Sequence, residues 1–466
     1  MDEHNFDLIF LGGGPSGYQG AIRAAQLGKR VAVIEDRDLG GVCLNRGCIP
    51  TKTIRASAQL LSQARQAKSY GLIIPEAQPD MPAIIARKNK VVSLVRGGVA
   101  QLFRANGISL YQGRGKFLSP QELMVEGEDG STLLKGKKVV IATGSRPLLR
   151  APFDVPIPGA LTSDGILDIN EVPKSLAVIG GGVVGLELAA IMAALGSQVT
   201  ILEAREQILP GDDREMVAYL ERMLKRQKIK LMTAITVTAV ESANGFTLTL
   251  SNGGTLTADL VLVATGRIPN TENIGLENIG LNYSGQFIPV NARMETEVEN
   301  IYAAGDIVGG WMLAHVAFME GIIAAESAAG LQSIMDYRVV PRCIFTFPEF
   351  AAVGLSEEEA GHNYQAKAFT FPLKSLGMAQ ALGEWEGLIK LVVNTETDHI
   401  LGGHIIGAHA AELVAEIALA MRNQVPVQGI IETIHAHPTM SEAVLEVAQA
   451  SAGHSIHILP PQKIIH

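Results

Sequence analysis

Two stretches of the chain repeat one pattern of apolar, small and polar residues. They are DLIFLGGGPSGYQGAIRAAQLGKRVAVIE at 7–35 and SLAVIGGGVVGLELAAIMAALGSQVTILE at 175–203, at a constant offset of 168 residues. Each begins with a short β-branched and aliphatic run, turns through glycines, and continues as an alanine-rich stretch to a Leu-Gly pair. Each then ends in a second apolar run closed by a glutamate. This order predicts a βαβ unit, formed twice.

The glycines of each unit have separate tasks in a dinucleotide site. The first permits a tight turn after the strand, the second lets the backbone approach a pyrophosphate, and the third lets the helix pack closely on the sheet. These residues are Gly12, Gly14 and Gly17 in the first copy and Gly180, Gly182 and Gly185 in the second. An ordinary glycine turn would explain a single match, but here the glycines, helix, second strand and acid agree twice. Two dinucleotides in one chain imply electron transfer between them.

An acidic residue ends the second strand of each unit. Glu35 and Glu203 are placed where a carboxylate accepts hydrogen bonds from an adenosine ribose. Glu203 would also repel a 2′-phosphate, which favours NAD over NADP at the second site, although Arg205 lies close by.

The rest of the pattern predicts further strands and a separate C-terminal region. VVIATGSRP at 139–147 and LVLVATGRIPN at 260–270 read as strands ending in Ala-Thr-Gly, where the chain crosses between the two nucleotide domains. IYAAGDIVG at 301–309 is a strand ending in a Gly-Asp turn, in which Asp306 could simply close the turn. After about residue 340, alternating apolar positions predict strands near 388–393 and 399–406 and a helix over about 410–422.

Composition narrows the possible classes of protein. A chain of 466 residues should divide into three or four domains, and its abundant glycine and 47% hydrophobic residues suit α/β layers. The net charge of −9 makes a nucleic-acid groove or an anionic membrane surface an unfavourable partner. No apolar run has the length of a membrane span, and the acidic opening passes directly into a strand, so the cytoplasm is the expected location.

Two of the three cysteines lie in GGVCLNRGCIPTK at 40–52. Cys43 and Cys48 have four residues between them and no second pair, which disfavours a structural zinc site. On a regular helix their Cα atoms would be about 8 to 9 Å apart, too far for a disulfide, so a bridge requires a distorted turn. Gly47 and Pro50 supply flexibility and a helix-start signal, and a helix N-terminus favours the thiolate.

Two other readings of the cysteine motif stay open. The cysteines could be two small buried apolar residues, although this explains neither their spacing nor the glycines around them. Lys52 shares a helix face with Cys48 and could favour a thiolate or a reduced flavin, or it could be a solvated surface lysine.

A candidate general base lies in HAHPTMSEAVLE at 435–446. His437 precedes a proline and should be extended just ahead of a helix. Glu442 matches a capping box with Thr439, and it could also orient the imidazole of His437 and raise its basicity; both can hold together. No spacing supports a metal cluster of His437 with His435, His454 and His457, and no metal is expected.

These motifs, in this order and across nearly the whole chain, resemble the flavin-dependent pyridine nucleotide disulfide oxidoreductases, and their lipoamide-oxidising branch most. The resemblance rests on the glycine fingerprint at 12–17, GGVCLNRGCIPTK, GGGVVGLELA, ATGRIPN, AAGDI and HAHPTMSE. It implies an α/β fold with two Rossmann-like domains, for FAD and NAD, and a C-terminal α+β dimerisation domain. The expected divisions are 1–148 for FAD with the redox disulfide, 149–270 for NAD, 271–340 completing the FAD domain, and 341–466 for the interface.

The resemblance also implies roles for individual residues. Cys48 would lie against the flavin as the charge-transfer thiolate, and Cys43 would exchange with a dihydrolipoyl substrate. Lys52 would stand near the flavin N5 and pair with Glu187. His437 and Glu442 would act as acid and base from the other subunit of a homodimer. The implied FAD contacts are Gly12, Gly14, Gly17, Glu35, Lys52, Gly144 and Asp306, and the implied NAD contacts are Gly180, Gly182, Gly185, Glu203 and Gly266.

The implied partner is a lipoyl-bearing carrier protein of a 2-oxoacid dehydrogenase complex, a glycine cleavage system or a related assembly. Three features depart from the usual family pattern. Val316 stands where lysine is frequent, Phe347 where histidine is frequent, and KSLGMAQALGEWEG at 374–387 replaces a stretch that usually carries an asparagine and an arginine. They leave the redox core intact and bear on the identity of the lipoyl-bearing partner.

Alternatives remain within and outside the family. A reductase of glutathione or another small disulfide is the nearest, but Glu203 favours NAD where such reductases commonly use NADP. A mercuric reductase should carry a C-terminal vicinal cysteine pair, which the ending HILPPQKIIH lacks. A non-catalytic dinucleotide-binding subunit would not need Cys43, Cys48, His437 and Glu442 together.

Overall fold

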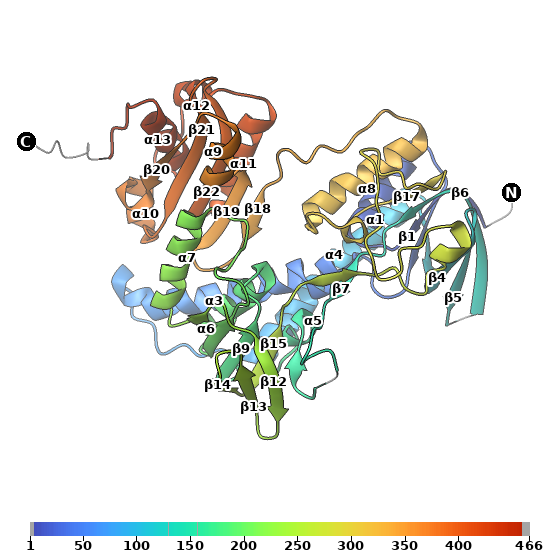
Figure 1. Cartoon of the computed structure of the whole chain (residues 1–466), viewed down its shortest axis with the longest axis horizontal. Helices are drawn as coiled ribbons and strands as arrows, with labels where there is room; N and C mark the ends of the chain where they lie inside the picture. The colour runs from blue at the N-terminus through green and yellow to red at the C-terminus, as the bar shows by residue number, and fades with distance from the viewer. Residues whose placement is uncertain (1–3, 129, 156, 459–466) are drawn as a thin grey trace, which may run out of the picture. The chain divides into compact units, whose positions relative to one another are not determined.

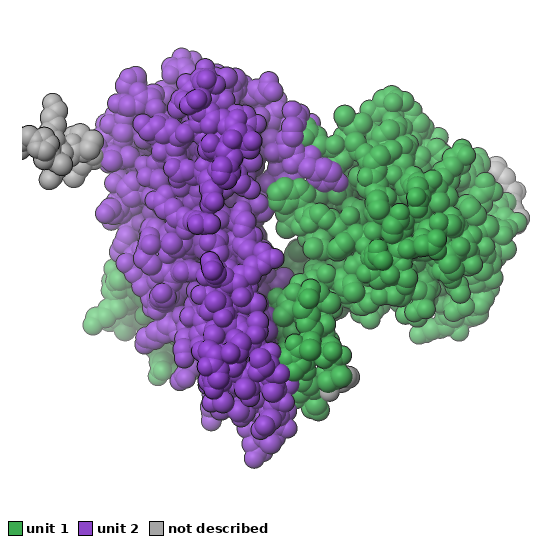
Figure 2. Space-filling view, in the orientation of Figure 1, with its two compact units in different colours: residues 1–172, 263–336 green, residues 173–262, 337–466 purple. Residues whose placement is uncertain are grey.

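The computed structural model describes residues 4–128, 130–155 and 157–458. The chain divides into two compact units, residues 1–172 with 263–336 and residues 173–262 with 337–466. Figure 1 colours the chain from its N-terminus to its C-terminus, and Figure 2 colours the two units separately. Within the described ranges, no helix combines the length and the apolar character that crossing a membrane requires.

The first repeat forms the centre of the unit 1 sheet. Strand β1 (Asn5–Leu11) pairs in parallel with β2 (Val31–Glu35) and with β6 (Gly130–Ile141), and α1 (Pro15–Gln26) connects β1 to β2. The sheet order is β3-β2-β1-β6-β5-β4, with β17 pairing in parallel with β6. The remaining strands are β3 (Ser109–Gln112), β4 (Arg114–Ser119), β5 (Glu122–Gly127) and β17 (Ile301–Ala303).

Helices and short connections complete unit 1. α1 and α8 (Ala314–Ala329) cross so closely that a Cβ on Gly20 would lie 2.6 Å from the Gly321 carbonyl oxygen, so glycine is required there. β7 (Ser145–Pro147) pairs antiparallel with β16 (Arg267–Pro269), which joins the two Ala-Thr-Gly segments. The other elements are α2 (Gly41–Arg46), α3 (Cys48–Gln66), α4 (Met81–Ala105), α5 (Ser163–Ile166), β8 (Ala160–Leu161) and the 3-10 turns Ala67–Tyr70, Leu276–Ile279 and Asp306–Val308.

The second repeat folds in the same way in unit 2. β9 (Ser175–Ile179), α6 (Val183–Leu195) and β10 (Gln198–Leu202) form its βαβ unit, within the strand order β11-β10-β9-β15. The remaining elements of this region are α7 (Arg214–Arg226), β11 (Lys230–Met232), β15 (Leu260–Val263) and a three-stranded antiparallel ribbon of β12 (Val237–Ser242), β13 (Phe246–Leu250) and β14 (Thr255–Ala258).

The C-terminal part of unit 2 is an antiparallel sheet covered by helices. The strand order is β18-β19-β22-β21-β20, and β21 (Leu388–Asn394), β22 (His399–Gly407) and α11 (Ala410–Arg422) lie where the sequence predicts two strands and a helix. The others are β18 (Arg342–Ile344), β19 (Glu349–Gly354), β20 (Ala366–Pro372), α9 (Glu357–Asn363), the 3-10 turn Leu373–Ser375, α10 (Gly377–Leu382), α12 (Val427–Glu432) and α13 (Glu442–Ser451).

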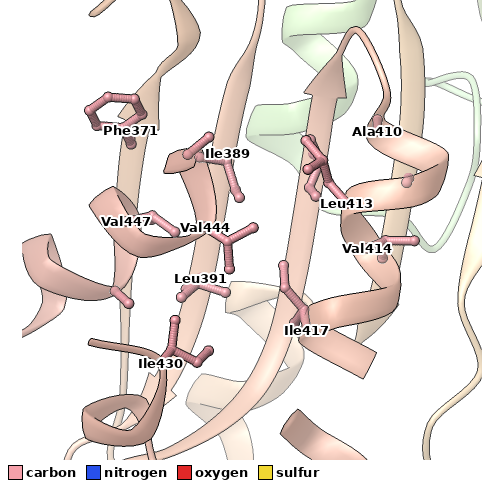
Figure 3. Close-up of a cluster of buried hydrophobic side chains, with 14 of the residues drawn as sticks. Phe371, Ile389, Leu391, Ala410, Leu413, Val414, Ile417, Ile430, Val444 and Val447 are labelled. Carbon is pink, nitrogen blue, oxygen red and sulfur yellow. The ribbon is translucent and has the colours of Figure 1, made fainter. Parts of the chain in front are cut away.

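The core of this C-terminal part lies between the sheet and its helices. Phe371, Ile389 and Leu391 project from the strands toward Ile417 of α11 and Val444 of α13 (Figure 3). All five are essentially inaccessible to solvent, so the helices are held on the sheet by burial of apolar area.

A buried group of charges joins α7 to this sheet. Lys390 of β21 is 1% exposed, and its ammonium contacts Asp213 at 3.1 Å, Glu215 at 2.9 Å and Glu357 at 2.6 Å. Asp213 also caps α7 by accepting the Glu215 and Met216 amides. Burial opposes ionisation of Asp213, but the Glu357 amide and Lys390 outweigh it and hold the pKa of that carboxyl below its ordinary value.

Candidate active site

The first glycine turn has the geometry of a dinucleotide site. Gly12 has a φ of +113°, and a Cβ on Gly17 would lie 1.9 Å from the Gly12 carbonyl oxygen, so neither position accepts a side chain. Gly14 caps α1 without any side-chain hydrogen bond. The amides of the first helical turn are therefore left to bind an anion such as a pyrophosphate.

Glu35 is buried at the end of β2, where two backbone amides hold its carboxylate. Gly13 N–H donates to Oε2 at 2.8 Å and Arg37 N–H donates to Oε1 at 2.9 Å. Burial raises the pKa of the Glu35 carboxyl, although both amides oppose that shift. Each oxygen keeps a second lone pair, which a ribose hydroxyl can use.

The second copy reproduces these contacts. Gly181 N–H donates to Glu203 Oε2 at 2.6 Å and Arg205 N–H donates to Oε1 at 2.8 Å. A Cβ on Gly185 would lie 2.1 Å from the Gly180 carbonyl oxygen, whereas one on Gly182 would meet no atom within 4 Å. An arginine thus occupies the same place in both copies, and both turns fit a dinucleotide.

The crossing segments bring the other expected cofactor residues together in unit 1. Gly144 and Gly266 both have positive φ, at +68° and +122°. Asp306 opens a 3-10 turn, and its Oδ2 accepts the Ser145 hydroxyl at 2.5 Å and faces Arg267 Nε at 3.5 Å. Asp306 therefore does more than close its own turn, because its carboxylate also contacts the strand pair β7 and β16.

The two cysteines lie on either side of a break between helices. Gly47, with φ −138° and ψ −106°, ends α2 and precedes α3, so Cys48 is the first residue of a 19-residue helix. This is the distortion that the sequence predicts. The hydrogen bond with the Cys48 thiol, together with burial, raises the pKa of the Cys43 thiol, and the positive charge of Lys52 opposes the shift. Both cysteines are partly buried and unbridged, and Cys48 is the main cause of the shift at Cys43, so the two side chains interact across the break.

Two residues near the thiols were not expected from the sequence. Tyr18 of α1 lies close to Cys43. Burial is the main reason that the pKa of the Tyr18 phenol is raised, and the Cys43 thiol adds to that shift. Asn45 of α2 donates its side-chain amide to the carbonyls of Asp38, Leu39 and Gly41 at 3.3, 3.2 and 2.9 Å. The positions of Tyr18 and Asn45 in the glycine and cysteine motifs did not indicate these contacts.

The proposed base and acid are paired in unit 2. His437 Nδ1 and Glu442 Oε1 are 2.8 Å apart, and the Thr439 amide donates to Glu442 Oε2 at 2.9 Å. Burial opposes ionisation of Glu442, but the Thr439 amide and His437 outweigh it and hold the pKa of its carboxyl below the ordinary value. His437 is 77% exposed, so its Nε2 edge is accessible.

The expected capping box at Thr439 is only half formed. The Thr439 hydroxyl donates to the Ala436 carbonyl, and α13 begins at Glu442 with Ser441, not Thr439, as its N-cap. The prediction of a complete box was wrong, because the helix starts three residues later than Thr439 and the hydroxyl closes the preceding turn.

Two other histidines of this region each bond a different glutamate. His435 Nε2 lies 2.8 Å from Glu416, and His457 Nδ1 lies 2.6 Å from Glu446, one turn beyond Glu442 on α13. Within the described part of the chain, no group of three or more acidic, histidine or cysteine residues could hold a metal ion.

The remaining expected residues lie partly in helices and partly in loops. Glu187 is buried on α6 and accepts the Phe345 amide at 3.0 Å. Val316 is buried in α8, the Phe347 carbonyl accepts the Gln227 side chain, and residues 374–387 include α10. Cys43, Cys48 and Lys52 belong to unit 1, and Glu187, His437 and Glu442 belong to unit 2.

Comparison with known proteins identifies the family. Residues 6–321 match the pyridine nucleotide-disulphide oxidoreductase family, and residues 340–448 match its dimerisation domain. The chain belongs to this family. The predicted family and fold class, with two Rossmann-like domains and a C-terminal dimerisation domain, are confirmed.

Several relatives match this family member along nearly their full length. It is 41% identical to a dihydrolipoyl dehydrogenase of Chlamydia muridarum over 98% of this chain and 99% of the relative, and 42% identical to one of Thermus scotoductus over 97% and 99%. Among solved structures, LpdA from Mycobacterium tuberculosis superposes with a TM-score of 0.88 at 28% identity, covering 95% of this chain and 99% of that one.

Proposed function

We propose that this chain is a dihydrolipoyl dehydrogenase, which oxidises protein-bound dihydrolipoyl groups to the lipoyl disulfide and reduces NAD. The observation that carries the proposal is the break at Gly47, which places Cys48 at the N-terminus of α3 and Cys43 on α2, with an interaction between the two side chains beside it. Full-length similarity to dihydrolipoyl dehydrogenases, at 41% identity to that of Chlamydia muridarum, supports it.

The two glycine turns and the acids that follow them would hold the two cofactors. FAD would lie on the turn at Gly12, Gly14 and Gly17, with Glu35 at its ribose and Asp306 and Gly144 further along. NAD would lie on the turn at Gly180, Gly182 and Gly185, with Glu203 at its ribose. A contact of NAD with Gly266 is what the family resemblance implies. When bound, the flavin supplies two-electron transfer between the reduced cysteine pair and the nicotinamide. The charge of Lys52 reaches Cys43. A pairing of Lys52 with Glu187 is what the family resemblance implies.

The side chains of this chain carry the thiol exchange. Glu442 binds Nδ1 of His437, so Nε2 is the nitrogen that takes the proton from a dihydrolipoyl thiol. The resulting thiolate attacks Sγ of Cys43 in the Cys43–Cys48 disulfide and forms a mixed disulfide, releasing Cys48 as a thiolate. The second substrate thiol then displaces Cys43, so the lipoyl disulfide leaves and both cysteines are reduced.

The working assembly in this proposal is a homodimer joined through residues 340–448, in which His437 and Glu442 serve the cysteines of the other subunit. The match to the dimerisation domain supports the dimer. Ile434, three residues before His437, is 97% exposed in a single chain, as expected of an apolar side chain that a second copy covers. The proposed partner is a lipoyl-bearing carrier of a 2-oxoacid dehydrogenase complex, a glycine cleavage system or a related assembly in the cytoplasm.

One assay tests the proposed reaction against its alternatives. Purified protein is mixed anaerobically with dihydrolipoamide and either NAD or NADP, and in parallel with oxidised glutathione and either reduced nucleotide. We expect reduction of NAD by dihydrolipoamide and little turnover with glutathione. Glutathione reduction would identify a reductase of small disulfides, and no turnover with either substrate would identify a non-catalytic subunit.

Cys48→Ser tests the role of the thiol pair. The variant should keep bound yellow flavin, because Cys48 is not part of the glycine turn, and should lose lipoamide turnover by at least about 10³-fold, because no disulfide can form. Flavin absorbance and steady-state rates measure both quantities. Unchanged turnover would refute the assignment of the pair.

A further inference from the structure

Asn45 lies between the two cysteines, and thiol exchange makes no chemical use of its side chain. We infer that Asn45 is a positioning residue, which promotes formation of the Cys43–Cys48 bridge by fixing α2 to the turn at 38–41. The inference rests on the proposed redox role of the two thiols.

The amide of Asn45 acts here as a donor. Its Nδ2 faces three carbonyl oxygens, those of Asp38, Leu39 and Gly41, at 3.3, 3.2 and 2.9 Å. Its Oδ1 is buried and accepts no hydrogen bond. An aspartate, a leucine or an alanine could not supply these donors.

The turn that Asn45 binds is itself fixed to the first glycine turn. Gly40 N–H donates to the Gly13 carbonyl at 2.8 Å, and a Cβ on Gly41 would lie 2.7 Å from Gly14 Cα. Arg96 of α4 forms an ion pair with the Asp38 carboxylate. Residues 38–40, which lead into α2, are therefore held in place. Asn45 ties α2 back onto them through the carbonyls of Asp38 and Leu39, and its bond to Gly41 lies within α2 itself.

The other cysteine is held separately. The Thr51 amide and hydroxyl both donate to the Gly47 carbonyl, at 3.0 and 2.6 Å, and so fix the first turn of α3 where Cys48 lies. Cys48 is thus fixed through α3 and Cys43 through α2. The geometry of the break at Gly47 depends on both attachments.

Bridge formation depends on how often the two sulfurs meet in a bonding geometry. A disulfide needs Cα atoms about 4.4 to 6.8 Å apart and a narrow dihedral range, so freedom of α2 lowers the effective concentration of one thiol at the other. Loss of the Asn45 donors should therefore favour the dithiol over the disulfide, while the glycine turn and its flavin contacts stay in place.

The experiment measures the disulfide equilibrium directly. Flavin-loaded wild type, Asn45→Leu, Asn45→Asp and Asn45→Ser are equilibrated anaerobically in mixtures of oxidised and reduced dithiothreitol, quenched with acid and alkylated. Mass spectrometry of the peptide carrying both cysteines then gives the ratio of disulfide to dithiol. In the reaction, the two cysteine thiols become a disulfide while oxidised dithiothreitol takes up two electrons and two protons.

For Asn45→Leu and Asn45→Asp we expect this ratio to fall about tenfold at a fixed buffer composition, equal to about 30 mV for a two-electron couple. Asn45→Ser keeps one donor, so its ratio of disulfide to dithiol should lie between that of wild type and those of Asn45→Leu and Asn45→Asp. This variant keeps the test decisive if Asn45→Leu and Asn45→Asp fail to fold. The control is Asn106→Leu, which removes a similar amide-to-carbonyl bond, to Leu102 at 2.8 Å, at the end of α4.

The outcomes separate this inference from the proposed function. A wild type that forms no bridge in any buffer would refute the redox role of the thiols and leave nothing for Asn45 to position. A wild type that forms the bridge, with folded Asn45 variants within twofold of its ratio, would overturn the inference about Asn45 alone. A lower unfolding temperature without a change in the ratio would also count against it, since that is a purely structural effect.

Discussion

His437 and Glu442 form a pair in which the partner of one ring nitrogen, Nδ1, is defined. Nδ1 is bound to Glu442 and the ring is largely exposed, so Nε2 is the edge available to a substrate thiol. Glu442 is in turn fixed by the Thr439 amide. Because the Thr439 amide fixes the Glu442 carboxylate, that carboxylate holds the imidazole of His437 in one orientation.

Glu442→Gln should lower kcat by about 10²-fold, because the amide retains a contact for Nδ1 but removes the charge that supports proton uptake. Steady-state kinetics with dihydrolipoamide measure the loss. Glu446→Gln is the matched control, since Glu446 binds His457 in the same manner one turn further along α13. A control variant as slow as Glu442→Gln would attribute both losses to helix stability.

The same carboxyl should influence stability with a definite dependence on pH. The pKa of Glu442 is lower in the folded state than in the unfolded state. The ionised carboxylate therefore stabilises the fold at pH values above the ordinary pKa of a glutamate, and this stabilisation is lost as the pH falls through the pKa of the folded state. Urea unfolding of wild type and Glu442→Gln should therefore differ at pH 7 and converge below about pH 4. A difference that grows on acidification would contradict this assignment.

At the scale of elements, two glycines in the turn of the second repeat have different roles, one in folding and the other in binding NAD. Gly185→Ala would place a Cβ 2.1 Å from a backbone oxygen, whereas Gly182→Ala meets nothing within 4 Å. We expect Gly185→Ala to destabilise the NAD-binding region by about 2 kcal/mol or more. Gly182→Ala should unfold as wild type does but bind NAD about tenfold more weakly, because its methyl group obstructs the pyrophosphate.

Thermal unfolding and NAD titration, with flavin absorbance to verify the first site, distinguish these two outcomes. Equal loss of stability in both variants would show that Gly182 is also structural.

Sequence patterns predicted the elements whose apolar periodicity is strong. The predicted helix at about 410–422 is α11 (Ala410–Arg422), and the strands near 388–393 and 399–406 are β21 and β22. The break at Gly47 followed from the distance that a disulfide allows. These features depend on local sequence, so local sequence is sufficient to find them.

Features that depend on which of several partners a polar side chain meets were missed or misplaced. The Thr439 hydroxyl could accept an amide of the helix or donate to the preceding turn, and it donates to the Ala436 carbonyl. The lysine at 390 reads as an interruption of an apolar strand, because its carboxylate partners at 213, 215 and 357 are remote in sequence. Asn45 likewise looks like an ordinary polar residue until the turn at 38–41 is placed beside it.

For unit 2 as a whole, the buried ammonium at Lys390 links α7 to the C-terminal sheet. Lys390→Met should lower the free energy of unfolding by about 3 to 5 kcal/mol, because it leaves the buried Asp213 carboxylate without its cation. Urea unfolding at pH 7 measures this, with Lys367→Met on the exposed side of β20 as control. The deficit should shrink as acid protonates Asp213, whose folded pKa is lowered; a deficit independent of pH would contradict this explanation.

At the scale of the assembly, Ile434 tests whether a second copy completes the site. Ile434→Asp should convert the dimer to a monomer at micromolar concentration, because a carboxylate would be buried in the interface. Turnover should fall by at least about 10²-fold with it, since His437 would no longer reach its cysteines. Sedimentation and kinetics measure both, and Leu118→Asp, an exposed position on β4, serves as control. A fully active monomer would rule out an intersubunit base.

The duplicated amide clamp on Glu35 and Glu203 has a consequence for how the two cofactors are told apart. Each acid is bound by the amides at equivalent positions, and each is followed by an arginine two residues later. In the proposed binding mode, the adenosine halves of FAD and NAD would meet the same carboxylate, held by the same two amides. This part of the site would then not distinguish a flavin from a nicotinamide, and selection between them would come from other residues.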